Sequence, residues 1–150
     1  MSTTDEPHER QAGPPFSPTI ALLTASRVIE LELTAALKPH GLTLRKYGVL
    51  GHIAGSPGLS MSDLARRSGI TVQSVHALIG GLVDAGLVRS EVESAGLAAR
   101  VSVTEAGSDL LRRIAESVSE LDSRLFADDE MRALSDALAA IANRRFRGGR

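Results

Sequence analysis

Apolar residues recur every three or four positions along most of the chain, a spacing typical of amphipathic helices. The first such stretch runs from Ile20 to Leu37. It predicts a helix that begins at Pro18, with the preceding serine as its N-cap. Pro39 and Gly41 are expected to end it.

Two shorter helices are expected next. One covers about residues 43–54 and ends at Ser56-Pro57-Gly58. The segment Ser60-Met61-Ser62-Asp63 is a capping box with aspartate in place of the usual glutamate or glutamine. It predicts a short helix over Leu64–Ser68 that Gly69 closes.

A fourth helix follows after a short turn. Thr71 is a good N-cap for a helix over Val72–Ala85, and Gly86 stands where a C-terminal glycine ends such helices. The apolar face of this helix is expected to be buried, and it consists of Val75, Leu78, Ile79 and Leu82.

After the fourth helix the apolar period changes from that of a helix to that of a strand. Apolar or small residues alternate with charged ones over residues 88–93, Ser94-Ala95-Gly96 turns the chain, and the alternation resumes over residues 99–103. This pattern predicts a short two-stranded antiparallel hairpin.

Two longer amphipathic helices are expected at the end of the chain. Thr104-Glu105-Ala106-Gly107 caps the first, and Asp128-Asp129-Glu130 starts the second with acids at its positive end. The apolar stripes are Leu110 or Leu111, Ile114, Val118, Leu121 and Leu125 in the first helix, and Met131, Leu134, Leu138 and Ile141 in the second.

The composition, with 43% hydrophobic and 23% charged residues and a formal net charge of −1, is that of a globular chain. The absence of cysteine excludes disulfides, iron–sulfur clusters and thiolate zinc sites. An aromatic content of 3% argues against a base-stacking surface for single strands. No apolar run reaches the roughly 18 residues of a membrane helix, and no signal peptide is expected, so we predict a cytoplasmic chain without a membrane partner.

The order helix, short turn, helix and hairpin predicts a winged helix-turn-helix within a mostly α-helical fold. The second helix of the pair, Val72–Ala85, then presents a polar face that can enter the ~12 Å wide major groove of double-stranded DNA. The hairpin reaches sideways to the backbone or minor groove. Residues 40–103 carry a formal charge of +2, whereas residues 104–142 carry −5, so the winged segment is the more basic one.

Three segments make the chain resemble the MarR family of bacterial transcription regulators. They are Leu64-Ala65-Arg66-Arg67-Ser68-Gly69-Ile70-Thr71, Leu82-Val83-Asp84-Ala85-Gly86-Leu87-Val88 and, above all, Val101-Ser102-Val103-Thr104-Glu105-Ala106-Gly107. The resemblance covers about residues 18–145. It implies a homodimer whose terminal helices interlock and whose winged modules meet successive major grooves of a pseudopalindrome. The resemblance also implies a response to a small aromatic or phenolic ligand, which many members of the family show.

Pattern and resemblance together divide the chain into five parts. Residues 1–17 are expected to be a disordered tail, 18–42 a first dimerisation helix, 43–103 the winged helix-turn-helix domain, 104–146 the later dimerisation helices, and 147–150 a basic tail. The apolar stripes outside the winged domain exceed what that domain needs, so we expect the surplus to be buried against a second copy.

Four side chains on the predicted recognition helix face outward at helical spacing. Gln73 can pair bidentately with adenine, Ser74 can bond a base edge or a phosphate, and His76 can donate to guanine or to a phosphate. Ala77 can meet a thymine methyl group, and Thr71 lies at the start of the helix. Exposed side chains of these types more commonly contact only water, so each stays a candidate.

The candidates for phosphate contacts are Arg45, Lys46, Arg66, Arg67, Arg89 and Arg100. Elsewhere the sequence departs from the family's pattern, since Val72–Ala85 contains no lysine or arginine and the wing tip, residues 94–98, lacks an Asp-Arg pair. Glu91 and Glu93 repel phosphate if they face it, and Gly80-Gly81 weakens the helix by roughly 1 kcal/mol per glycine. We expect only two to three phosphate contacts per subunit.

The remaining expectations concern a ligand pocket, an alternative function, enzymatic activity and cofactors. A ligand pocket between the first, second and long helices could include Arg27, His40, Tyr47 or His52, each of which also suits a structural role. The uncharged recognition helix favours, as an alternative, a winged-helix module that has lost DNA affinity and serves as a protein-interaction or sensor subunit. An enzyme is not expected, because no catalytic or phosphate-loop motif occurs. No cofactor is expected, and the histidines lack metal-site spacing.

Overall fold

The structure is a computed structural model that describes residues 13–91 and 100–147, with side chains in the last helix up to Arg144. Most of each predicted tail lies outside these residues. Glu93 and the predicted wing tip, residues 94–98, lie outside them as well. The described chain forms α1 (Pro18–Leu37), the 3-10 turn η1 (Lys38–His40), α2 (Leu44–Gly55), β1 (Leu59–Ser60), α3 (Met61–Ser68), α4 (Val72–Asp84), β2 (Val88–Glu91), β3 (Arg100–Val103), α5 (Glu105–Leu125) and α6 (Asp129–Arg147). The predicted fold class, mostly α-helical with a winged helix-turn-helix, is confirmed.

Side-chain caps begin the helices where the sequence predicts them. The hydroxyl of Ser17 accepts a hydrogen bond from the backbone N–H of Ile20, and Thr71 and Thr104 cap α4 and α5 in the same way. Each cap satisfies an N–H group that the first helical turn leaves unpaired. The predicted glycine stops at Gly69 and Gly86 are also confirmed, because both have positive φ angles, of 65° and 71°. Gly41, with a φ of 69°, ends the 3-10 turn η1, whereas α1 itself already ends at Leu37.

The predicted start of α3 at Leu64 is wrong, since this helix begins at Met61. Ser60 is its N-cap: the Ser60 hydroxyl accepts from the Asp63 N–H at 3.1 Å and donates to Asp63 Oδ2 at 2.8 Å. The residue after an N-cap is already helical, so the capping box itself forms the first turn.

The predicted two-stranded hairpin is incomplete, because the sheet has three strands in the order β1-β3-β2. β1 pairs antiparallel with β3, with Leu59 opposite Val101 and Ser60 opposite Arg100. A strand of two residues is too short to show an alternating pattern, which is why the sequence gives no sign of it.

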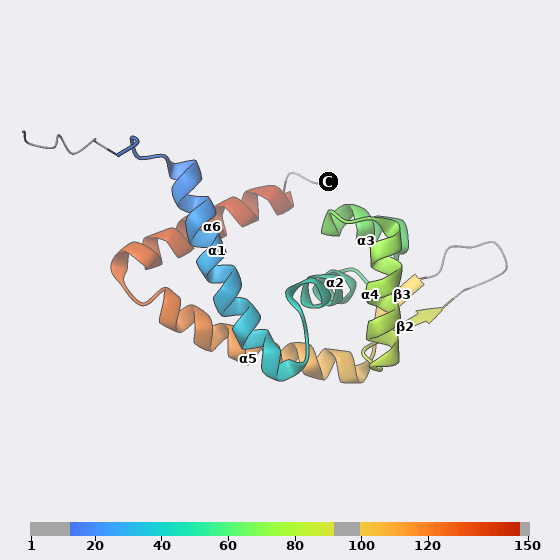
Figure 1. The fold of residues 1–150 in the computed structure, drawn as a ribbon. Helices are drawn as coiled ribbons and strands as arrows, with labels where there is room; N and C mark the ends of the chain where they lie inside the picture. Colours follow the sequence, from blue (N-terminus) through green and yellow to red (C-terminus); the bar gives the residue numbers. More distant parts are fainter. Residues whose placement is uncertain (1–12, 92–99, 148–150) are drawn as a thin grey trace, which may run out of the picture.

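The helices form two groups joined by α5 (Figure 1). α2, α3, α4 and the sheet lie around the N-terminal half of α5, whereas α1 and α6 lie toward its C-terminal half. α1 packs on α5, and an ion pair of 2.7 Å between Glu32 of α1 and Arg124 of α5 crosses that contact. No helix in residues 13–91 or 100–147 is both long enough and apolar enough to span a membrane.

One aliphatic core holds the winged module together and extends beyond it. Leu37 and Leu42 belong to this core, so the end of the predicted first dimerisation segment packs with the winged module. Leu78, predicted to be buried, is half-buried. The fully buried side chains from the other elements include Leu50, Ile53, Leu64, Val75, Leu82, Val101 and Ile114.

In contrast, the apolar stripes of α1 and α6 are largely uncovered in the single chain. Ile20, Leu23 and Leu31 are 60%, 67% and 60% exposed, and Leu138 and Ile141 on α6 are 41% and 48% exposed. Exposed contiguous apolar surface of this kind marks an interaction site.

Candidate nucleic-acid interface

The first turn of α4 is held by two hydroxyl side chains. Thr71 Oγ1 accepts from the Ser74 N–H at 3.1 Å, and the two hydroxyl oxygens lie 2.8 Å apart in a second hydrogen bond. Ser74 is half-buried. The pair therefore fixes the start of α4, and the Ser74 hydroxyl already has one partner before any contact with a base or phosphate.

The remaining predicted reading residues lie on the outer face of the same helix. Gln73, His76 and Ala77 are exposed, whereas Val75 and Ile79 between and beyond them are buried. Among the described residues, no hydrogen bond engages the Gln73 or His76 side chain. Both are thus available to an external partner.

The six candidate phosphate-binding cations differ in what already neutralises them. Arg66 pairs with Asp63 at 2.6 Å, and Arg89 pairs with Glu91 at 3.3 Å while donating to Ser102 Oγ at 2.8 Å. Arg100 also has an interaction partner. Each of these side chains must share or give up a partner before it binds a phosphate.

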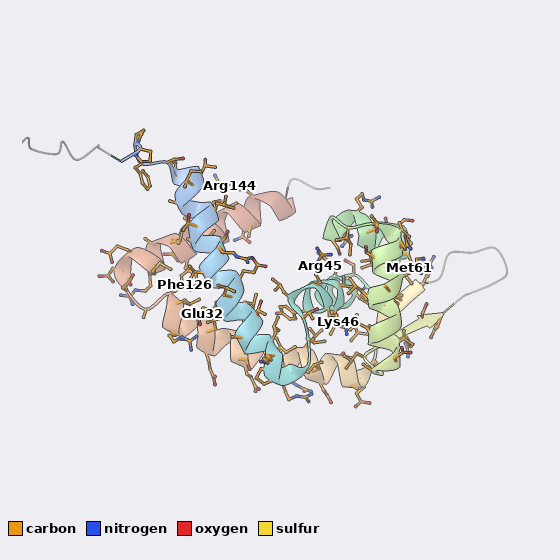
Figure 2. All side chains as sticks on the ribbon, in the orientation of Figure 1. Glu32, Arg45, Lys46, Met61, Phe126 and Arg144 are labelled. Atoms are coloured by element: carbon orange, nitrogen blue, oxygen red, sulfur yellow. The ribbon has the colours of Figure 1, made fainter. Side chains whose placement is uncertain are left out.

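Three cations around α2 have no carboxylate partner within the part of the chain that the structure describes. Arg67 donates to the Ser56 hydroxyl at 2.9 Å, and Arg45 and Lys46 make no ion pair. Figure 2 labels Arg45 and Lys46 on α2, which contacts both α1 and α4. The positive charge that remains free for a ligand is therefore concentrated at α2 and the end of α3.

Lys46 supplies a cation beside the recognition helix, which has none of its own. A Cβ atom built on Gly81 of α4 would lie 3.5 Å from Lys46 Nζ, so the ammonium group lies next to the glycine pair. Sequence reasoning named Lys46 but missed this contact. The glycine pair in the middle of a helix was the only local signal of a close approach.

The pKa of the Asp63 carboxyl group is lowered by its neighbours. The hydrogen bond from the Ser60 hydroxyl, together with the hydrogen bond and charge of Arg66, lowers the pKa of Asp63 and outweighs the opposing effect of burial. The Asp63–Arg66 pair therefore stays ionised at neutral pH and keeps Arg66 partly neutralised.

Two cavities flank α2. The larger, of about 770 Å³, lies between α1, the turn before α2, and α4. The smaller, of about 380 Å³, lies between α2 and the end of α3. The lining of the larger includes Leu31, Thr34, Ala35, Lys38, Leu42, Arg45 and Leu78, and that of the smaller includes Arg45, Gly48, Val49, His52, Arg67, Ser68 and Ile70.

The four residues predicted for a ligand pocket do not line one cavity. His52 lines the smaller cavity, while Arg27 pairs with Glu30 at 3.1 Å along α1. His40 Nε2 lies 2.9 Å from Ser117 Oγ of α5, and Tyr47 packs against the core.

The larger cavity instead receives cations that sequence reasoning did not assign to a ligand. Lys38 was not singled out, and Arg45 was assigned to DNA alone. No spacing in the sequence could have shown that Lys38 and Arg45 line the same cavity, because it is the 3-10 turn between α1 and α2 that brings the two residues together. Within the described ranges, no cluster of three or more histidine or acidic side chains could hold a metal ion.

Comparisons with known proteins bear directly on this arrangement. A family model described as MarR family matches residues 40–96. The HTH-type transcriptional repressor Rv2887 of Mycobacterium tuberculosis is 36% identical over 107 residues, which cover 71% of this chain and 77% of the relative. The chain belongs to the MarR family.

Solved structures of MarR-family proteins share the fold. The crystal structure of Rv2887 in complex with DNA superposes with a TM-score of 0.70 at 30% identity, covering 84% of this chain and 98% of that one. Its complex with p-aminosalicylic acid gives 0.70 at 29% identity, covering 85% and 99%. MepR of Staphylococcus aureus, at 17% identity, matches with 0.71 over 87% and 99% and shows the fold alone.

Proposed function

We propose that this MarR-family chain is a transcriptional repressor that binds pseudopalindromic double-stranded DNA as a homodimer and responds to a small aromatic acid. The observation that carries the proposal is the outer face of α4, where the side chains of Gln73 and His76 are exposed and make no hydrogen bond within the described residues. The ammonium group of Lys46 lies farther along the same helix, at Gly81. A helix with this face, capped and projecting from a winged module, suits the major groove. A relative of the same family has been solved in complex with DNA.

The contacts divide into reading and positioning. Gln73 and His76 read base edges, and Ala77 contacts a thymine methyl group. Thr71 and Ser74 position the first turn of α4, because the Ser74 N–H is bonded to Thr71 Oγ1. The phosphate contacts come first from the cations without a carboxylate partner, which are Arg45, Lys46 and Arg67. Arg66, Arg89 and Arg100 contribute less, because their present partners compete with the phosphate.

A second copy of the chain is the occupant we propose for the exposed faces of α1 and α6. The leucine and isoleucine side chains there are largely exposed in the described chain, and a homodimer buries them in an isologous interface. Two winged modules held in this way meet two half-sites. As a regulator of transcription the protein acts in the cytoplasm, and no enzymatic activity is part of the proposal.

The larger cavity is the proposed effector site. Lys38 and Arg45 offer cations to a carboxylate, while Leu31, Leu42 and Leu78 offer apolar walls to a ring. Leu78 belongs to α4, so a ligand here touches the recognition helix directly. Structures of Rv2887 with salicylic acid and p-aminosalicylic acid have been solved, which supports this class of ligand.

The test is fluorescence anisotropy on DNA from upstream of the chain's own gene, measured from low to physiological salt. Two to three phosphate contacts per subunit predict a slope of roughly −4 to −5 in log affinity against log salt for the dimer. A slope near −10 would show that many more cations bind phosphate than the three without a carboxylate partner among the described residues. Binding at no salt concentration would favour the alternative, a protein-interaction or sensor module.

The effector is tested on the same DNA. Added salicylate should release it, and Ala35→Leu, which places a larger side chain in the effector cavity, should raise the salicylate concentration needed for release. Release that is unchanged in this variant would show that salicylate acts elsewhere.

A further inference from the structure

The smaller cavity, between α2 and α3, is bordered by positive and hydrogen-bonding groups and by no acid among its described lining residues. Arg45 and His52 enter from α2, and Arg67 enters from the end of α3. Arg45 has no ion-pair partner in the described chain, and Arg67 is bonded only to the Ser56 hydroxyl. The volume of about 380 Å³ falls within the range of small-molecule sites.

The room in this cavity comes from a glycine inside a helix. Gly48 lies near the middle of α2, and a Cβ atom built on it would meet no other residue within 4 Å. Glycine in such a position destabilises a helix by about 1 kcal/mol relative to alanine. No close packing requires it here, and because Gly48 lines the cavity, a larger side chain at this position would take up some of its space.

A second feature of the cavity wall is an unsatisfied hydroxyl group. Ser68 lines the cavity, and its Oγ is buried without a hydrogen-bond partner in the described structure. A buried polar group without a partner is unfavourable by about 1–3 kcal/mol. The cavity wall therefore contains a polar atom whose hydrogen bond the described chain does not supply.

We propose that the α2–α3 cavity is a second ligand site, which takes a small organic anion consisting of a carboxylate on a compact apolar body. Guanidinium groups bind carboxylates through paired, charge-assisted hydrogen bonds, which Arg45 and Arg67 can provide from two sides. Val49 and Ile70 supply the apolar walls. This site is separate from the proposed effector cavity, although Arg45 lines both.

The position of the site predicts its effect, which rests on the proposed DNA-binding function. An anion bound here occupies Arg45 and Arg67, two of the three cations available for phosphates. It also contacts Ser68–Ile70, the turn that leads into the N-cap of α4. The anion and DNA therefore oppose each other, and by linkage DNA weakens the anion as much as the anion weakens DNA.

Isothermal titration of the full chain with salicylate, without DNA, tests the separate site. The expected result is two sites per chain. Gly48→Leu fills the smaller cavity and Ala35→Leu fills the larger, so each variant should leave one site. Gly51→Leu is the matched control, because Gly51 is exposed on the same helix, its Cβ direction is open, and it lines neither cavity; it should keep both sites.

Charge-removing variants give a readout that does not depend on how a new leucine packs. Arg67→Gln should weaken the smaller site about tenfold, the effect of losing one charge-assisted hydrogen bond, and leave the larger site unchanged. Arg45→Gln should weaken both sites, since its side chain lines both cavities.

One site per chain, unaffected by Gly48→Leu and by Arg67→Gln, would overturn the second site. If Ala35→Leu abolishes that single site, the proposed effector cavity stands without it. Two sites that both disappear in Ala35→Leu would place both ligands in the larger cavity and also overturn the proposal. Two separable sites in a chain that binds no DNA would refute the DNA-binding function while leaving the second site in place.

Discussion

Gly107→Ala is predicted to destabilise the protein, although alanine is the better helix former. Gly107 is buried in the first turn of α5, where that helix meets the turn after α4. A Cβ atom there would overlap the backbone oxygen of Leu87 and lie 2.6 Å from Val103 Cγ1, whereas real Cβ contacts stay beyond 3.0 Å. The Leu87 carbonyl cannot retreat easily, because it accepts from the Thr104 N–H at 3.0 Å.

The magnitude follows from three opposing effects. Overpacking of this kind destabilises by about 1–3 kcal/mol. Displacing the Leu87 carbonyl weakens its hydrogen bond from Thr104, which adds about 1 kcal/mol. The greater helix propensity of alanine offsets about 1 kcal/mol. We therefore expect a net loss of about 1–3 kcal/mol in the free energy of unfolding.

Urea denaturation at one fixed protein concentration measures this loss, since the stability of a dimer depends on concentration. Gly80→Ala is the control: Gly80 is exposed within α4, its Cβ direction is open, and the same substitution there should stabilise by up to about 1 kcal/mol. If Gly107→Ala unfolds at the same or a higher urea concentration than the parent chain, the close packing of α5 on Leu87 is refuted.

Three further predictions test other parts of the structure. Truncation after Phe126 should give aggregated or unfolded chain, because it removes α6 and with it part of the apolar surface proposed to bind a second copy; a soluble, cooperatively folding monomer would contradict the dimer. Gln73→Ala should weaken binding to the preferred operator by about 1–3 kcal/mol and relax preference at one base position. An equal loss on random DNA would remove Gln73 from base reading. Asp63→Asn should lower the melting temperature at neutral pH. Because the folded pKa of Asp63 is depressed, the difference should shrink as pH falls below the ordinary value of 3.8 and vanish below the lower folded pKa, and a difference independent of pH would disprove the role of its charge.

Local chemistry made most of the fold predictable from the sequence. Caps such as Ser17 and Thr71, and stops such as Gly86, act within one helical turn, so their residue types alone locate the helix ends. The strand β1 could not be predicted, because its two residues are defined only by pairing with β3, about forty residues later.

The candidate site was less predictable, since its contacts join residues far apart in the chain. The bond between His40 and Ser117 takes His40 away from the expected ligand pocket, and the proximity of Lys46 to Gly81 follows from the packing of α2 on α4. The outward face of α4 could be predicted, because helical periodicity alone sets it.

The docking of α5 on the end of the recognition helix has a consequence for operator geometry. Thr104 Oγ1 donates to the Gly86 carbonyl oxygen at 2.6 Å, so α5 starts at a fixed point beside α4 and then runs for 21 residues toward the proposed dimer surface. At 1.5 Å per residue that is about 30 Å, close to the 34–36 Å that separates half-sites one DNA turn apart. The length of α5 thus sets the half-site spacing that the dimer accepts. Adding or removing one helical turn within α5 should change that spacing, while each recognition helix keeps its base preference.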